Sequence, residues 1–489
     1  MSGDKRDQAS PFPPQGSATP AGQQSVIGQP DVTIDMLQDD VLLDIFDSYR
    51  NLVSRPDGMW KWQKLLHLCQ RWRYIVLASP RRLDLRIECD RRTPTWKLLD
   101  IWPPFPIYVT YDPRCREGAR GIHNIFAALQ RRNRISQIDL YSMTSREVDQ
   151  IADAIDEPFP VLTDLSVQTL SADLPDVTAE LPDSFLGGSA PCLQSFFLEG
   201  TAFPALPNLV LSANHFHTLY LFGIPHAGYI PPEAMVAFLL PLHNLKSLTI
   251  GFTSPESRPQ ALQTDPPSLT HALLPSLTKF GFHGASEYLL DFIARIDAPM
   301  LNTLHITFSL GAVPDILQLH TFIDRTDRLK TFIHAEVFLF PYEVRAVFKS
   351  PASPGLDITC RVPEPDWPLS SMMRLYEQLL TIPSQVEQLE LRGKARNELG
   401  WYEAPDDPRW LQLLVPFVSV KSLYVFKMLC PFVASVLEDL TGDGGTNALP
   451  TLNNLFLEGF ETPASFDEAI KAFLSMRHSS GHPVAVGCW

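Results

Sequence analysis

The sequence lacks the closely spaced cysteine pairs that form zinc sites and disulfide frameworks. Its seven cysteines are odd in number and far apart, which is typical of reduced thiols inside the cell. Long apolar runs are also missing: none approaches the length of a membrane span, and the N-terminal residues contain no apolar segment of a secretory signal. These absences predict a soluble protein of the cytoplasm or nucleus with no membrane partner.

Motifs of the common enzyme classes are absent as well. The sequence contains no nucleotide-binding loop, zinc-protease helix or nucleophile elbow. The glycines at 441–447 lack the lysine and the spacing of a phosphate loop, and the carboxylates at 404–410 have no other catalytic group beside them. Two groups of histidines lack cysteines or carboxylates at the spacing of metal ligands: His215, His217 and His226, and His478 and His482. We expect no catalytic residue, no metal and no cofactor.

Composition and charge narrow the choice of partners. Apolar residues make up 45% of the chain and charged residues 19%, so we expect a sizeable core. The formal charge is −15, but residues 1–134 carry a net charge of +5 and the remainder carries −20. Because an acidic body repels phosphate backbones, the sequence predicts no nucleic-acid partner. A basic partner and a merely solvated acidic surface both agree with this charge.

The N-terminal part of the chain changes from a polar segment to an apolar, helical one. Residues 1–30 are rich in proline, glycine, serine and glutamine, which predicts a disordered tail. In residues 31–82, apolar side chains recur at helical spacing around 41–49 and 62–76, and Pro80 ends the second helix. Two or three short helices are too few to hide these side chains among themselves. They therefore cover a partner or pack on the rest of the chain, two alternatives that the pattern leaves open.

Residues 83–134 form the predicted junction and N-terminal cap of the following domain. Residues 83–111 look extended, because apolar and polar residues alternate first and prolines follow. Acidic residues are interleaved with seven arginines around this junction: Arg71, Arg73, Arg81, Arg82, Arg86, Arg91 and Arg92. We expect the arginines to cover apolar surface and to pair with Asp84, Glu88 or the acidic body at the junction, rather than to bind nucleic acid.

A short pattern, apolar-x-x-apolar-x-apolar, recurs eleven times from residue 135 onward. The copies end at residues 140, 167, 198, 221, 250, 282, 306, 334, 391, 425 and 457. The steps are 23 to 34 residues, apart from one of 57 in which residues 355–360 fit a degenerate copy. Helix-like runs lie between copies, at 232–242, 287–296 and 315–326.

This spacing is typical of leucine-rich repeats. In such an array each unit contributes a strand and a helix or irregular arc, and stacking the units makes a curved parallel sheet on the concave side. The predicted fold class is thus α/β, with a small helical domain followed by a repeat solenoid over 135–470 and a C-terminal tail over 471–489.

Several aromatic residues occupy positions that face outward on the concave side of the predicted sheet. Side chains alternate along a strand, so the residues between and beside the last two apolar positions of each copy point away from the core. The candidate substrate-binding residues are Phe197, Tyr220, Phe222, His305, Tyr424, Phe426 and Phe456. Exposed aromatics can anchor a protein ligand, although the chain's own loops or its tail could cover them instead. As a hypothesis, the acidic body and these aromatics select a basic segment with an apolar anchor, which charge reversal across the concave face would test.

Residues 37–46, 62–87 and 99–109 resemble F-box proteins of mushroom-forming fungi, in which an F-box precedes divergent leucine-rich repeats. About 80 residues match closely, and the string "WRYIVLASPRRLDL" is specific; the remaining chain matches only in architecture. The resemblance implies that residues 34–80 dock on the Skp-type adaptor of a cullin–RING (SCF) ubiquitin ligase, while the repeats hold a substrate protein.

Transferred by position, the resemblance also names the residues of the F-box. Its adaptor-binding and core positions correspond to Leu37, Val41, Leu42, Ile45, Phe46, Trp62, Leu66, Cys69 and Trp72. One departure is Gln38, which stands where the family usually has a proline that fixes the start of the helix and contacts the adaptor.

Three functions agree with the sequence to different degrees. The first is a non-catalytic substrate receptor of an SCF ligase. The second is a leucine-rich-repeat interaction scaffold that is not assembled into a ligase and uses its helical domain only as a cap. The third, an enzyme built on a solenoid, lacks residues to carry it.

Overall fold

The computed structural model describes residues 34–52, 61–78, 85–89, 95–102, 104–113, 121–170, 179–253, 271–308, 317–340, 343–350, 353–361, 372–376, 379, 382–393, 408–441, 448–458 and 464–488. The predicted disordered tail at 1–30, Pro80, and most of the segments 404–410 and 441–447 lie outside these described residues. The chain divides into two compact units, Met1–Leu83 and Asp84–Trp489, which we call the helical unit and the sheet unit.

Among the described residues of the helical unit, three α-helices surround a small core. Its elements are η1 (Ile34–Met36), α1 (Asp39–Leu52), α2 (Lys61–Leu68) and α3 (Gln70–Ala78). The core consists of Leu42, Phe46, Ile75 and Val76, and the ring of Trp72 packs 4.7 Å from that of Phe46. The sequence predicts one continuous helix over residues 62–76, but the chain breaks at Cys69 into α2 and α3, which pack against each other.

Two arginines of the helical unit bond to groups of the same unit. Arg71 forms an ion pair with Asp39 at 2.7 Å and donates a hydrogen bond to the Leu37 carbonyl at 2.6 Å. Arg73 donates to the Leu66 carbonyl at 2.9 Å. The expectation that these arginines pair with carboxylates holds for Arg71, whose partner Asp39 stands at the start of α1. Arg81, Arg82, Arg91 and Arg92 lie outside the described residues.

The sheet unit is built on one large, mostly parallel sheet. Within the described residues it has sixteen strands in the order β1-β2-β3-β4-β6-β8-β9-β11-β13-β16-β15-β14-β17-β18-β19-β20. The strands are β1 (Arg86–Glu88), β2 (Ile107–Tyr111), β3 (Ile135–Met143), β4 (Asp164–Thr169), β6 (Ser195–Glu199), β8 (Thr218–Ile224), β9 (Ser247–Phe252), β11 (Lys279–Gly284), β13 (Thr303–Phe308), β14 (His334–Phe340), β15 (Glu343–Ser350), β16 (Ser353–Arg361), β17 (Gln388–Gly393), β18 (Ser422–Val425), β19 (Asn454–Leu457) and β20 (Ala485–Cys488).

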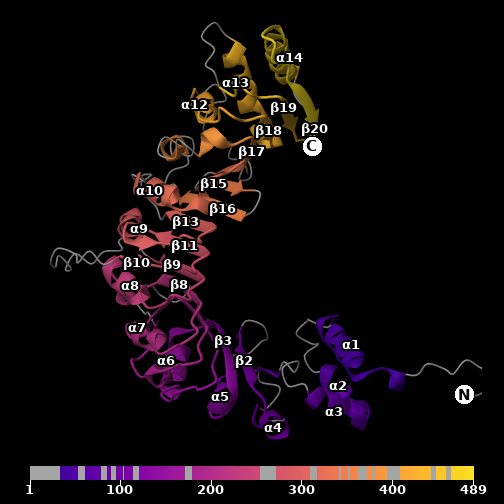
Figure 1. Cartoon of the computed structure of the whole chain (residues 1–489), viewed down its shortest axis with the longest axis vertical. Helices are drawn as coiled ribbons and strands as arrows, with labels where there is room; N and C mark the ends of the chain where they lie inside the picture. Colours follow the sequence, from indigo (N-terminus) through magenta and orange to yellow (C-terminus); the bar gives the residue numbers. More distant parts are fainter. Residues whose placement is uncertain are drawn as a thin grey trace, which may run out of the picture. The chain divides into compact units, whose positions relative to one another are not determined.

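Helices and two small ladders complete the repeats. The helices are α4 (Thr95–Ile101), α5 (Ile122–Leu129), α6 (Ser145–Ala154), α7 (Leu206–Leu211), α8 (Pro232–Leu239), α9 (Ser286–Ile293), α10 (Leu317–Arg325), α12 (Arg409–Leu414), α13 (Cys430–Thr441) and α14 (Ala464–Ser479). Strands β5 (Ala179–Glu180) and β7 (Thr201–Ala202) pair in parallel, as do β10 (Ala272–Leu273) and β12 (Ile296–Asp297). In Figure 1, helices α6 to α10 run along one side of the stacked strands.

The repeated apolar positions lie beside one another across the sheet. The register pairs Leu219 with Leu248, Leu248 with Phe280, Phe280 with Leu304, and Leu304 with Leu356. All five of these residues are completely buried. Each repeat thus covers the apolar side of the next repeat. The parallel sheet confirms the stacking that the repeat spacing predicts.

One repeat departs from the prediction. The copy predicted at residues 329–334 is not a strand. Strand β14 begins only at its last residue, His334, so Ile333 precedes the strand. The degenerate copy at 355–360 is instead the strand that follows β13 in the sheet, and it pairs with β13 in parallel. Strand β15 then pairs antiparallel with both β16 and β14. A three-stranded antiparallel insert therefore interrupts the parallel array.

The two ends of the sheet unit also differ from the sequence analysis. Helix α4 lies within residues 83–111, which look extended in the sequence, although β1 and β2 on either side pair in parallel as strands. Residues 471–489 are predicted to be a tail, yet α14 extends to Ser479 and β20 adds to the sheet, pairing Leu455 with Val486. No helix among the described residues is both long and apolar enough to cross a membrane.

Candidate binding surfaces

The outward positions of the repeat strands form a continuous row across the sheet. The register places Phe197 beside Tyr220, then Thr249, Gly281, His305 and finally Asp357 on neighbouring strands. We call the side of the sheet that carries this row the open face, because its residues alternate with the buried apolar positions.

Three of the predicted aromatics come together at one part of the open face. The rings of Phe197 and Tyr220 stack 3.8 Å apart with an angle of 7° between their planes, and Phe222 lies 5.8 Å from Tyr220. Phe222 continues to His283, whose ring is 5.3 Å away. We call Phe197, Tyr220 and Phe222 the aromatic row. Their adjacency was expected from the repeat register, and their role in binding stays a prediction.

A second aromatic group lies at the other end of the sheet. Tyr424 and Phe456 stack with their ring centroids 4.6 Å apart, and the guanidinium group of Arg392 lies 4.7 Å from the ring of Phe426. Seven strands separate β8 from β18 in the sheet order. The predicted substrate-binding residues therefore form two separate aromatic groups, with His305 between them.

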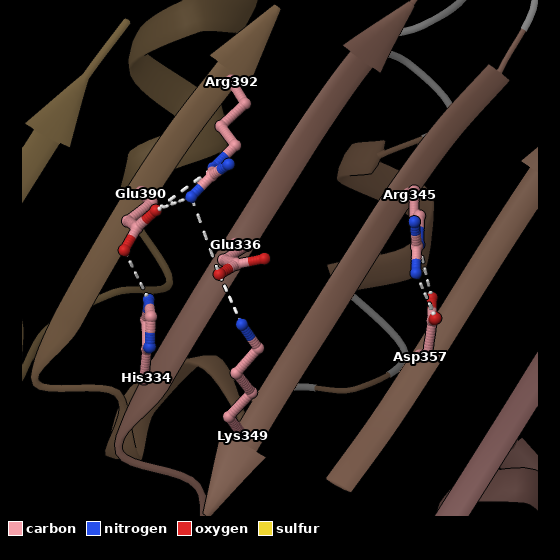
Figure 2. A network of polar contacts seen from close by, with 7 residues as sticks. All are labelled: His334, Glu336, Arg345, Lys349, Asp357, Glu390 and Arg392. Carbon is pink, nitrogen blue, oxygen red and sulfur yellow. Dashed lines mark hydrogen bonds and ion pairs between the residues drawn. The ribbon is translucent and has the colours of Figure 1, made fainter. Parts of the chain in front are cut away.

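Three buried carboxylates lie on strands between these groups in the sheet order: Glu336, Asp357 and Glu390. Figure 2 shows them with their charged partners. Asp357 receives two hydrogen bonds from Arg345, at 2.8 and 2.6 Å, and lies 3.1 Å from Nδ1 of His305. Glu336 pairs with Lys349 at 2.5 Å. Glu390 pairs with Arg392 at 2.6 Å and with His334 at 3.0 Å. Each carboxylate is charge-compensated, as side chains with about a tenth of their surface exposed must be.

The pKa of Asp357 reflects these partners. Burial by itself raises the pKa, but the hydrogen bonds from His305 and Arg345 outweigh that effect and hold it below the ordinary value of 3.8. Sequence reasoning missed Asp357, Glu336 and Arg345. The antiparallel insert brings them onto the open face, and no repeated pattern marks its strands.

His334, Glu336 and Glu390 could also be considered as metal ligands, because one ligand atom of each lies within 4.8 Å of the others. However, Lys349 and Arg392 already contact the carboxylate oxygens. A metal ion would have to displace both cations, so this donor set suits an ion-pair network better than a metal.

Beside the network lies a hollow of about 620 Å³ in the open face. Its floor contains Thr249 and Gly281, and Phe222 and His283 line it on the side of the aromatic row. Lys279, His305, Arg345, Asp357 and Arg361 are further lining residues. The hollow thus adjoins both the aromatic row and the charged network.

The structure divides the implied adaptor-binding residues into two groups. Leu42 and Phe46 belong to the core of the helical unit, and Leu37, Leu66 and Trp72 pack against it. Val41 and Ile45 are instead 43% and 41% exposed, and Cys69 is exposed. The side chain of Trp62 lies outside the described part of the structure. Further large apolar side chains of this unit are exposed: Ile34, Met36, Leu68 and Tyr74.

Comparison with known proteins adds little to this geometry. No family model matches the chain, and no curated protein matches it. One solved structure, the leucine-rich repeat-containing protein LegL7 from Legionella pneumophila, is 11% identical over 79% of this chain and 97% of its own, with a TM-score of 0.29. A TM-score this low supports no argument about fold or function. The chain is thus described by its architecture, a mixed α/β protein with a large, mostly parallel sheet preceded by a small helical unit.

Proposed function

We propose that the chain is a non-catalytic substrate-recognition subunit of an SCF ubiquitin ligase. The helical unit docks on the Skp-type adaptor, and the open face of the sheet binds the substrate protein. The observation that carries the proposal is the exposure of Val41 and Ile45 on a helix whose neighbouring side, with Leu42 and Phe46, packs in the core. The resemblance of residues 37–46 and 62–87 to fungal F-boxes supplies the identity of the partner.

Helix α1 has two apolar sides. Leu42 and Phe46 are buried in the core, whereas Val41 and Ile45 follow each other at i and i+4 and so share the other side of the helix. Apolar surface removed from water contributes about 25 cal/mol per Å², so covering such residues favours binding of a helical partner. The absence of proline at position 38 does not prevent α1 from starting, because the Gln38 carbonyl accepts the hydrogen bond of the Leu42 amide at 3.1 Å.

The open face supplies the second half of the proposal. The aromatic row offers stacked rings on strands that the core holds in place. Aromatic side chains on a rigid surface lose little conformational entropy when a ligand covers them, which is why they dominate the energy of many protein interfaces.

Co-purification of the Skp-type adaptor with the full chain tests the docking. Val41→Asp and Ile45→Asp, singly and together, place a charge on the proposed interface and should reduce the retained adaptor roughly tenfold or more. Gln70→Asp is the matched control, because it adds the same charge at the exposed start of α3. Both positions 41 and 45 are partly exposed, so the variants should keep the helical unit folded.

The same experiment decides against the alternative. If wild-type chain retains no more adaptor than the double variant, the ligase assignment fails, and an interaction scaffold outside any ligase becomes the better description. That scaffold would use the same open face, so it predicts capture of a protein ligand without adaptor.

A further inference from the structure

The hollow in the open face contains a glycine, Gly281, where neighbouring strands carry side chains, and a second glycine leaves room for the ring at its edge. Gly281 occupies the outward row between Thr249 and His305, and Gly251 lies beneath the ring of Phe222. A β-carbon at Gly281 would meet the hydroxyl of Thr249 at 3.0 Å. Because Gly281 has no side chain, the floor of the hollow at this point is its backbone. The volume of about 620 Å³ is large enough for the side chain of a bound segment.

Most polar side chains around the hollow can donate hydrogen bonds. Four threonine hydroxyls line it from three strands, β9, β13 and β16: Thr249, Thr303, Thr307 and Thr359. Lys279 and Arg361 stand among the lining residues, and neither has an ion-pair partner within the described part of the chain. Groups of this kind bind carboxylate or phosphate oxygens.

The acidic groups at the hollow do not cancel this positive character. Asp357 is already held by Arg345 and His305, so its charge is compensated. Glu343 is the other carboxylate of the lining, and it stands opposite Arg361 in the β15–β16 ladder, so it offsets Arg361 in part and leaves Lys279 without a carboxylate opposite it. The formal charge of the chain is −15, yet the lysine and arginine residues of the lining, Lys279, Arg345 and Arg361, outnumber its two carboxylates.

We propose that the hollow around Gly281 binds an anionic side chain, a carboxylate or a phosphate, of the protein segment held on the open face. Lys279 and Arg361 supply the charge, the threonine hydroxyls supply hydrogen bonds, and Phe222 packs against the apolar part of the same side chain. The inference rests on the proposed function, in that the open face binds a protein ligand, and it names the chemistry of that ligand. It replaces the hypothesis of a basic segment, because the charges at this place favour an anion.

Isothermal titration calorimetry of the full chain tests the inference with two pairs of probes. The anionic probes are N-acetyl-phosphotyrosine amide and N-acetyl-glutamate amide, and the neutral counterparts are N-acetyl-tyrosine amide and N-acetyl-glutamine amide. At least one anionic probe should bind several-fold more tightly than its counterpart, and its affinity should fall as salt is added. Equal affinities within both pairs overturn the proposal.

Substitutions locate the site. Lys279→Gln and Arg361→Gln should each weaken the anionic probe about threefold to tenfold, since each removes one partly solvated charge contact. Lys246→Gln is the matched control: it removes the same charge from an exposed position just before β9 and outside the hollow, and it should leave binding unchanged. If the control weakens the probe as much as Lys279→Gln and Arg361→Gln do, the hollow is not the site.

Inorganic phosphate distinguishes a bound segment from a free ion. Because only the peptide-like probe reaches Phe222, phosphotyrosine amide should bind more tightly than inorganic phosphate. Equal affinity overturns the assignment to a protein side chain. None of these measurements involves the adaptor, so failure here leaves docking of the helical unit intact, and failure of docking leaves the hollow intact.

Discussion

At the scale of single residues, neighbours in the chain have opposite roles. Leu42 is fully buried, whereas Val41 beside it is 43% exposed, because a helix turns successive side chains by about a quarter of its circumference. The cysteines differ in the same way: Cys360 and Cys430 are buried, while Cys69, Cys192 and Cys488 are exposed. The F-box resemblance could not separate core from surface positions, since it assigns both to one motif.

The cysteines give a direct test of burial. Burial raises the pKa of the Cys360 thiol to about 12 and that of Cys430 to about 11, so neither forms the reactive thiolate near neutral pH. We expect iodoacetamide to label Cys192 in the folded chain and to label Cys360 and Cys430 only after denaturation. Peptide mapping by mass spectrometry measures this, and equal labelling of Cys192 and Cys360 in the folded chain would contradict it.

At the scale of elements, the antiparallel insert is the least regular part of the sheet. Strands β14, β15 and β16 take the place of one simple repeat, and the insert brings Glu336, Arg345 and Asp357 onto the open face. Near the start of β16, Gly355 has a φ of +89° and lies against the carbonyl of Phe348, beside an irregularity in the β15–β16 register.

Gly355→Ala should destabilise the sheet unit, because a β-carbon there would stand 2.0 Å from the Phe348 oxygen in addition to the backbone strain. The strain alone costs about 1–3 kcal/mol. Gly481→Ala is the matched control, with a φ of +80° but nothing within 4 Å of the added carbon. Urea denaturation of the full chain should show a larger loss of unfolding free energy for Gly355→Ala, and equal losses would contradict the steric argument.

The carboxylate network should make the stability of the sheet unit depend on pH. Because the folded-state pKa of Asp357 lies below 3.8, its stabilising contribution is complete above that value and is lost as the pH falls through the folded-state pKa. Asp357→Asn should therefore lower the unfolding free energy near neutral pH and flatten its decline in acid. Asp183→Asn, at an exposed position, serves as the control, and identical pH profiles for Asp357→Asn and wild type would contradict the prediction.

At the scale of the whole molecule, the two proposed activities belong to different compact units. The exposed residues of α1 lie in the helical unit and the hollow lies in the sheet unit. Each unit has its own buried residues, so a surface change in one leaves the packing of the other in place.

Adaptor docking and anion binding should therefore be separable. Val41→Asp with Ile45→Asp should reduce adaptor co-purification and leave the calorimetric affinity for the anionic probe unchanged. Lys279→Gln should do the reverse. Loss of both activities in both variants would show that the two surfaces are coupled or that the variants misfold, and thermal unfolding of each variant distinguishes these two outcomes.

The repeats can be predicted from the sequence alone, because strand alternation and the apolar spacing i, i+3 and i+5 are local patterns. Leu219, Leu248, Phe280 and Leu304 are found side by side as their spacing predicts. The aromatic row followed from the same register, since neighbouring repeats place equivalent positions on neighbouring strands.

The strand pairing of residues 329–361 depends on tertiary contacts and does not follow from the repeat pattern. Leu329 and Phe332 are buried as a repeat motif requires, yet they do not lie in a strand. The strand of this segment, β14, starts at His334 and pairs with β15 and with β17. The β14–β15 pairing joins neighbouring segments, but the β14–β17 pairing sets His334 beside Gln388, far away in the sequence, and a local pattern carries no information about that partner. The antiparallel pairing of β15 with β16 sets Arg345 against Asp357 and brings Arg345 and Arg361 to the wall of the hollow, so the charge of the candidate site could not be predicted from the sequence.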